Sequence, residues 1–125
     1  MSTYLYYFSY LCHKEDEMKD LTLTEEMFLL AVWKLKEDAY GVTIRQHVSL
    51  ETGRNYPYGT LYSALDKLTR QGYLIKTAGD PIPERGGRRK YYYHITKQGT
   101  EALKNAMELK RLLWDAETET ALGKS

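Results

Sequence analysis

The 125-residue sequence predicts a single, mainly helical α+β domain built from three helices, a β-hairpin and a long final helix. Two observations predict this order. Apolar residues recur at helical spacing in four segments, and two short aromatic and β-branched runs lie between the third and the fourth segment. With 42% hydrophobic residues, the chain has enough apolar material for one hydrophobic core at this length.

The first two helices are predicted at residues 24–36 and 42–51. Thr24 is the expected N-cap of the first helix, because its hydroxyl can accept a backbone N–H and two glutamates follow it at the positive end of the helix dipole. The second helix carries a narrow apolar stripe and is expected to end at Gly53, since glycine adopts the left-handed cap conformation without strain.

A third helix is predicted from Pro57 to about Arg70. Proline is tolerated in a first turn because its missing N–H would have no partner there. Three leucines spaced at i, i+4 and i+7 predict one buried stripe: Leu61, Leu65 and Leu68. The opposite face is polar, with Tyr62 on its flank, and carries Thr60, Ser63, Lys67 and Arg70.

The remaining elements are a hairpin and a long helix. Strands are predicted at residues 73–77 and 88–95, and the intervening loop holds three glycines and two prolines. Thr96 is the expected N-cap of a helix that runs to about Glu117, before a polar, fraying tail. Five residues repeat at the heptad spacing 4, 3, 4, 3 of a packed helix seam: Ala102, Ala106, Leu109, Leu113 and Ala116.

Positive charge is concentrated in one part of the chain. The formal net charge is only +1, but residues 67–111 hold eleven Lys and Arg against four Asp and Glu. Within Arg85–Lys90, four residues are cationic and the other two are glycines. Such a loop can reach phosphates, because glycine frees the backbone and arginine matches phosphate oxygens. Taken alone, the loop is equally consistent with a solvated hairpin tip.

Several classes of function are excluded by composition. Cys12 is the only cysteine, so the chain has no intramolecular disulfide and no thiolate metal site, and a reducing cytoplasm is the expected location. No nucleophile–base pair or ligand cluster is visible, so we expect neither an enzyme nor a bound metal or cofactor. The apolar run at residues 3–12 is shorter than the ~20 residues that span a bilayer, and no membrane partner is expected. It is either an extra packing element or, if translation starts at Met18, a peripheral segment.

Three helices followed by a hairpin is the order of a winged helix–turn–helix, in which the third helix enters the major groove and the hairpin forms the wing. Small residues at the start of the third helix, Gly59 and Thr60, would allow close approach to bases. Tyr58 and Tyr62 each supply a hydroxyl and a ring. The wing tip would be the basic glycine loop, so two independent features indicate the same arrangement.

Two motifs resemble those of PadR-like transcriptional regulators over residues 21–115. Residues 58–68, YGTLYSALDKL, followed by Gly72-Tyr73-Leu74, are similar to the third-helix signature of that family, and Gly87–Tyr92 with Ile95-Thr96 and Gly99 are similar to its wing strand. The resemblance implies a homodimeric repressor that binds a palindromic operator in double-stranded DNA. Many members release DNA when a small aromatic or apolar effector binds, and the sequence leaves open whether this protein does so.

The predicted site combines the third helix and the wing. The expected DNA-binding residues are Tyr58, Thr60, Tyr62, Ser63, Lys67, Arg88, Arg89 and Lys90, and the expected dimerisation residues are Ala102, Ala106, Leu109, Leu113 and Trp114. The corresponding division of the chain is an N-terminal extension (1–20), a winged helix–turn–helix domain (21–95), a dimerisation helix (96–117) and a tail (118–125). The alternative function is a winged-helix module that binds protein and not DNA.

Overall fold

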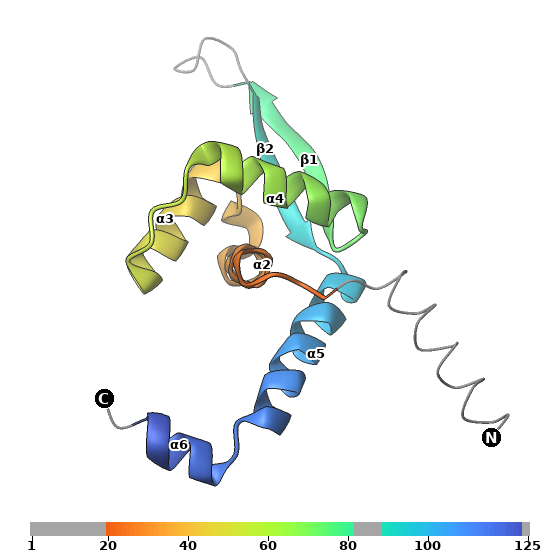
Figure 1. Ribbon diagram of the computed structural model, residues 1–125. Coiled ribbons are helices and arrows are strands. Elements are labelled where there is room, and N and C mark those ends of the chain that lie inside the picture. Colours follow the sequence, from red (N-terminus) through yellow and green to blue (C-terminus); the bar gives the residue numbers. More distant parts are fainter. Residues whose placement is uncertain (1–19, 82–88, 124–125) are drawn as a thin grey trace, which may run out of the picture.

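The computed structural model describes residues 20–81 and 89–123 (Figure 1). The first three helices are α2 (Leu23–Leu35), α3 (Gly41–Thr52) and α4 (Tyr58–Arg70), with a 3-10 turn at Lys36–Asp38 after α2. The hairpin strands β1 (Leu74–Pro81) and β2 (Arg89–Ile95) follow, and then α5 (Lys97–Leu113) and α6 (Ala116–Leu122). This order confirms the predicted mainly helical α+β class. No helix within the described residues is long and apolar enough to cross a membrane.

Helix α2 begins earlier than predicted, because its N-cap is Thr22 and not Thr24. The Thr22 hydroxyl accepts the Glu25 N–H at 3.1 Å, and the Glu25 carboxylate accepts the Thr22 N–H at 2.9 Å. This capping box needs a glutamate or glutamine three residues after the cap. Thr22 has Glu25 at that position, whereas Thr24 has Met27, so only Thr22 can form the reciprocal pair.

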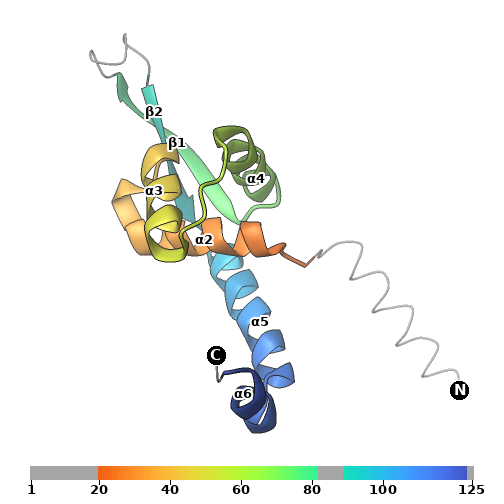
Figure 2. The same ribbon diagram turned by 60° about the vertical axis from the view of Figure 1, so that its left-hand side comes forward.

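The hydrophobic core lies between α2, α3, α4 and the hairpin (Figure 2). All three leucines of the predicted α4 stripe are fully buried in it. Pro57 is the N-cap of α4 and precedes its first turn. The predicted left-handed end of α3 is confirmed, since Gly53 has φ of 76°. The core residues are Phe28, Leu29, Ala31, Val32, Ala39, Ile44, Val48, Leu61, Leu65, Leu68, Leu74 and Tyr93.

The two strands form an antiparallel hairpin that is longer than predicted. Its register pairs Leu74 with Ile95 and Thr77 with Tyr92, and an irregularity falls between Ala78 and Pro81. Strand β1 therefore continues four residues past the predicted end, because β2 offers a long aromatic partner strand. The remainder of the predicted loop, residues 82–87, and the predicted first residue of the second strand, Arg88, lie outside the described part of the chain.

The extended residues Ala39 and Tyr40, just before α3, bind strand β2 through the backbone. The Tyr93 N–H donates to the Ala39 carbonyl at 2.8 Å, and Tyr40 forms an isolated antiparallel bridge with Tyr92. Since Tyr40 is also the residue before α3, strand β2 is connected directly to the start of that helix. The wing and the helix–turn–helix unit therefore share backbone hydrogen bonds as well as the core.

The junction between α4, β2 and α5 centres on Thr96, the predicted N-cap. Its hydroxyl donates to the Gly72 carbonyl at 2.6 Å and accepts the Gly99 N–H at 3.0 Å. Its own N–H donates to the Tyr73 carbonyl at 3.0 Å. One residue therefore caps α5 and binds the turn that ends α4.

The last helix is not the single element that the heptad pattern predicts. Helix α5 ends at Leu113, Trp114 has extended dihedral angles, and Asp115 caps α6 by accepting the Thr118 N–H at 2.8 Å. The Trp114 indole N–H also donates to the Glu119 carboxylate. The prediction of one helix to Glu117 with a frayed tail is therefore wrong, because aspartate favours a new N-cap over a helix interior.

Candidate nucleic-acid interface

The outward face of α4 carries the residues that the sequence predicts as DNA-reading. Burial of the leucine stripe turns the opposite side of the helix to solvent. Thr60 and Ser63 are exposed there, and Tyr58 and Tyr62 keep 41% and 43% of their surface exposed. Thr60 and Ser63 face the groove beside α2, whereas Tyr62 faces the cavity beside the hairpin, so the exposed side of α4 presents hydroxyl groups and aromatic rings on two flanks.

Tyr58 and Tyr62 are stacked on each other along this face. Their ring centroids are 6.1 Å apart and their planes differ by 22°. The Arg45 guanidinium, from α3, lies 4.9 Å from the Tyr58 centroid, and its Nε–H donates to the Tyr56 carbonyl at 2.6 Å. Sequence reasoning missed Arg45, because its partner residues are eleven to thirteen positions away and no periodic pattern joins them.

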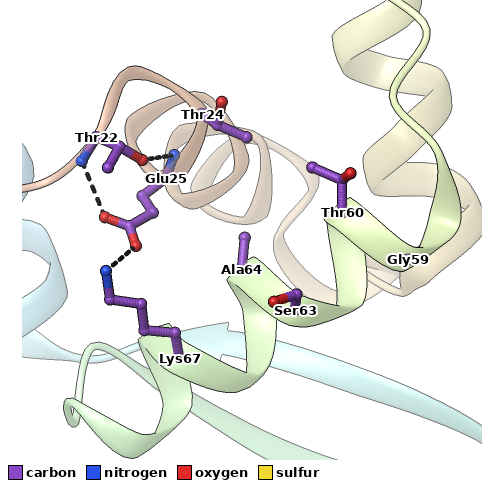
Figure 3. A pocket seen from close by; sticks show the side chains of 8 residues that line it. All are labelled: Thr22, Thr24, Glu25, Gly59, Thr60, Ser63, Ala64 and Lys67. Atoms are coloured by element: carbon purple, nitrogen blue, oxygen red, sulfur yellow. Dashed lines mark hydrogen bonds and ion pairs between the residues drawn. The ribbon is translucent and has the colours of Figure 1, made fainter.

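Lys67 lies on the same helix but is engaged with α2. Its ammonium group is 2.9 Å from the Glu25 carboxylate, as Figure 3 shows. The pair borders an open groove of about 470 Å³ between the start of α2 and the outer side of α4. Thr60 and Ser63 line this groove with Lys67, so the structure brings three of the predicted DNA-binding residues together.

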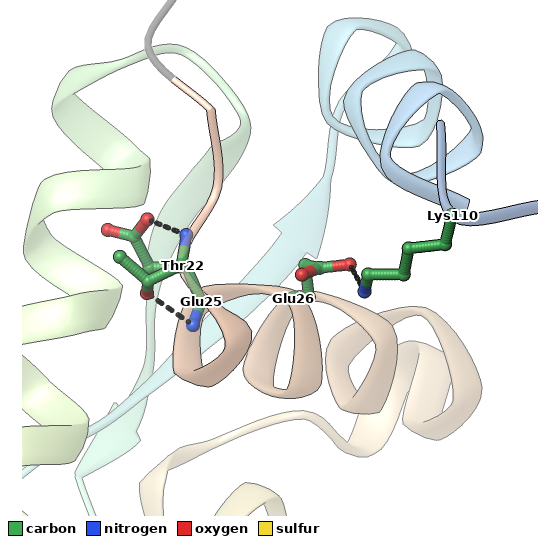
Figure 4. A network of polar contacts seen from close by, with 4 residues as sticks. All are labelled: Thr22, Glu25, Glu26 and Lys110. Carbon is green, nitrogen blue, oxygen red and sulfur yellow. Dashed lines mark hydrogen bonds and ion pairs between the residues drawn. The ribbon is translucent and has the colours of Figure 1, made fainter. Parts of the chain in front are cut away.

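Glu25 is the buried charged partner in this groove, with only 4% of its surface exposed. Burial raises the pKa of its carboxyl, but the Thr22 N–H and the Lys67 ammonium outweigh that effect and hold the pKa below the ordinary value of 4.5. Glu25 is therefore ionised at neutral pH. The polar network continues on the next residue, because Glu26 pairs with Lys110 of α5 (Figure 4).

The wing supplies cations beside α4. Arg89 is exposed at the start of β2, whereas Lys90 is half-buried with its ammonium 4.2 Å from the Tyr40 ring centroid. Lys76 of β1 lies 4.5 Å from the Tyr91 centroid. None of these three cations has an ion-pair partner within residues 20–81 and 89–123. Arg88, the other predicted wing cation, lies outside the described residues.

A small cavity of about 90 Å³ lies where the wing meets α3 and α4. Tyr62, Lys76, Arg89 and Lys90 line it, together with the buried Tyr93. Burial, with smaller effects from Asp66 and Tyr62, raises the pKa of the Tyr93 hydroxyl to about 12. Tyr93 therefore stays neutral, and the charge around this cavity is positive.

The predicted dimerisation residues lie on α5 and at its end. Ala102 and Ala106 are half-buried, whereas Leu109 and Trp114 are about half exposed and Leu113 is 83% exposed. The neighbouring Met107 and Leu112 are also exposed. An alternative to a dimer seam is that Leu109 and Leu113 pack on the chain's own first helix. Leu113 is too exposed for that, whereas Leu109 is about half covered.

The fold and this arrangement define the class of protein, a winged helix–turn–helix. Solved structures share the fold. A PadR-like transcriptional regulator from Bacillus cereus is 19% identical with a TM-score of 0.62, and the match covers 82% of this chain and 93% of that chain. A transcriptional regulator from Clostridium thermocellum is 24% identical with a TM-score of 0.61, over 80% of this chain and 89% of that chain. The protein smu.1704 from Streptococcus mutans is also similar (26%, 0.60, 86% and 97%). Comparison with curated proteins gave no match.

The model of the transcriptional regulator PadR-like family matches residues 29–105, which is more than half of the chain, and the chain belongs to that family. The resemblance of the two motifs is thus confirmed over the helix–turn–helix unit, the wing and the start of α5. Members of this family are transcriptional regulators and not enzymes, which also confirms that expectation.

Proposed function

We propose that the protein is a homodimeric repressor that binds a palindromic operator, with α4 in the major groove and the wing on the DNA backbone. The observation that carries the proposal is the exposed side of α4, which lies next to the cationic edge of the hairpin (Figure 1) and presents Tyr58, Thr60, Tyr62 and Ser63. Hydroxyl groups and rings can read base edges, whereas cations on the wing contact phosphates without reading sequence.

The wing residues have different parts in this proposal. Arg89 is exposed and free to reach a phosphate, and Arg88 precedes it on the basic glycine loop. Lys90 and Lys76 lie against aromatic rings, so they hold positive charge on the side of the hairpin that faces α3 and α4. Lys67 neutralises Glu25, which would otherwise place an uncompensated negative charge beside the reading face.

Dimerisation through α5 and its end explains the exposed apolar side chains there. A palindromic operator then follows from two-fold symmetry, since each protomer places one α4 helix in one half-site. The proposal includes release of DNA by a small aromatic or apolar effector. Trp114 is assigned to packing in the dimer interface and not to binding of that effector. Such a regulator acts in the cytoplasm, in agreement with the use of a single cysteine.

Selection of bound duplexes from a random pool tests the function directly. An enriched palindrome supports both sequence-specific binding and a dimer. Absence of enrichment, with no duplex bound at low salt, would contradict the proposal and favour a winged-helix module that binds protein.

The wing has its own test, the double substitution Arg88→Ala with Arg89→Ala. Each phosphate contact contributes about −0.9 to the slope of log K against log salt, so losing two should flatten the slope by about 1.8 and weaken binding on all sequences. The matched control is Lys97→Ala with Lys104→Ala, which removes the same charge from exposed positions on α5. Equal slopes for the two double variants would exclude the wing from phosphate binding.

A further inference from the structure

Gly41, the first residue of α3, lies against the Tyr62 side chain of α4. A Cβ atom at Gly41 would stand 2.1 Å from the Tyr62 hydroxyl oxygen, 2.7 Å from its Cζ and 3.1 Å from its Cε1. Heavy atoms in packed interiors do not approach this closely, so any side chain at position 41 displaces the tyrosine ring. The small size of residue 41 is therefore a requirement set by Tyr62.

The backbone gives no other reason for glycine at this position. Among the described residues, positive φ angles occur in Gly53, Gly72 and Lys36, and not in Gly41. Gly41 is helical and buried, in a helix where alanine has the higher intrinsic propensity. Local conformational preference would thus favour alanine, and the three atoms nearest to an added Cβ, which oppose it, all belong to Tyr62.

Tyr62 is held at two places. Its hydroxyl end contacts Gly41, and its ring stacks on Tyr58, which in turn lies under the Arg45 guanidinium. A ring that turned away from Gly41 would also change its stacking on Tyr58. The position of residue 41 is therefore transmitted to the aromatic part of the α4 reading face.

We propose that Gly41 is a specificity-determining positioning residue. Because it has no side chain, the Tyr62 ring can occupy the position in which it stacks on Tyr58 beside Arg45. The inference rests on the proposed function, because the ring reads bases only when α4 occupies the major groove. Gly41 itself does not touch DNA in this proposal. It sets how well the protein distinguishes its operator from other sequences.

The variant Gly41→Ala should lose operator preference while its stability stays nearly unchanged. The displaced atoms are the far end of a side chain that can rotate, so the fold persists and the change falls on the reading face. We expect the preference for the selected operator over a scrambled duplex to drop by roughly tenfold, about what one base contact contributes. Affinity for the scrambled duplex should remain unchanged.

The matched folding control is Gln46→Ala. Gln46 lies on the same helix as Gly41, and its side chain is exposed. Both variants should remain folded and melt at similar temperatures. In the free proteins, the ring-proton NMR signals of Tyr62 and Tyr58 should shift in Gly41→Ala and not in Gln46→Ala, which tests the contact without DNA.

A double-mutant cycle with Tyr62→Ala completes the experiment. Adding Gly41→Ala to Tyr62→Ala should cause no further loss of operator preference, because no ring remains to be displaced. Full operator preference in Gly41→Ala, or a loss that persists in the Tyr62→Ala background, would overturn the inference alone. A wild-type protein without operator preference would overturn the proposed function, and this inference with it.

Discussion

The winged helix–turn–helix unit and the C-terminal arm formed by α5 and α6 are stabilised in different ways. All core residues belong to the unit between Phe28 and Tyr93, whereas the arm contributes only Gly99 to the buried set and leaves Leu113 mostly exposed. The unit is therefore complete within one chain. Leu103 of the arm packs against the core, but several apolar side chains farther along α5 stay exposed among residues 20–81 and 89–123, as a surface for a second protein would.

The strongest test of this difference is a pair of leucine truncations. Leu65→Ala removes a fully buried side chain of α4 and should lower the free energy of unfolding by about 2–5 kcal/mol. Leu113→Ala removes an exposed side chain, and in dilute protein it should leave that free energy nearly unchanged. Urea unfolding of both variants measures this, and equal losses at low concentration would show that the arm belongs to the core.

The oligomeric state of α5 variants tests whether a second copy of the chain covers the exposed apolar surface of the arm. The double variant Leu109→Asp with Leu113→Asp places two charges on the proposed seam and should sediment as a monomer. Lys104→Asp, at an exposed position on the opposite side of the same helix, introduces a carboxylate away from the heptad residues and should leave the dimer intact. A dimer that persists in the double variant would move the interface to another surface.

The Glu25–Lys67 pair should make the unit, and not the arm, sensitive to acid. The pKa of Glu25 is lowered in the folded state, so its contribution is present above the ordinary value of 4.5 and is lost as pH falls through the lowered value. Glu25→Gln should lower the free energy of unfolding at neutral pH by roughly 1–3 kcal/mol. It should also weaken the pH dependence below 4.5.

A surface pair of the arm is the control for this measurement. Glu108 pairs with Arg111 at 2.6 Å, but both side chains are largely exposed. Glu108→Gln should therefore have no measurable effect on unfolding. Identical melting curves for the two glutamine variants across pH 3–7 would contradict a stabilising role of the buried pair.

The smallest effect is expected at the bend between α5 and α6. Asp115→Ala removes the N-cap of α6 and should increase hydrogen exchange in residues 116–122 without changing the melting temperature. Backbone and side-chain hydrogen bonds from Thr118 lower the pKa of Asp115, so the same fraying should occur in the wild type as acid protonates this carboxyl. Unchanged exchange would show that the Trp114–Glu119 contact alone maintains the bend.

Local patterns predicted most of the unit. The leucine stripe of α4, the Gly53 cap, the Thr96 cap and the order of elements all follow from spacing and residue type. The errors arose where two local signals competed. Thr22 and Thr24 both suit an N-cap, and only the position of Glu25 decides between them. Asp115 interrupts a heptad pattern that otherwise predicts continuous helix.

The candidate site was less predictable, because its organising contacts join distant segments. Sequence spacing placed Thr60, Tyr62 and Ser63 on one face, but it could not show that Lys67 binds Glu25, which lies 42 positions earlier. It likewise could not show that Tyr62 rests on Gly41 or that Arg45 lies over Tyr58. Arg88 lies beyond the described residues, so its role on the wing stays a prediction.

The hydrogen bonds of Thr96 couple the orientation of α5 to the orientation of α4, the helix proposed to enter the major groove. They join the turn that ends α4 to the first residues of α5, so in the proposed dimer the two α4 helices follow the angle between the two arms. A helix of 17 residues is about 25 Å long. A tilt of about 10° at its far end therefore moves α4 by roughly 4 Å, which is close to the ~3.4 Å rise of one base pair. In the proposed dimer, the half-site spacing that the protein accepts would thus be set by the geometry of the arm as well as by the residues proposed to face the bases.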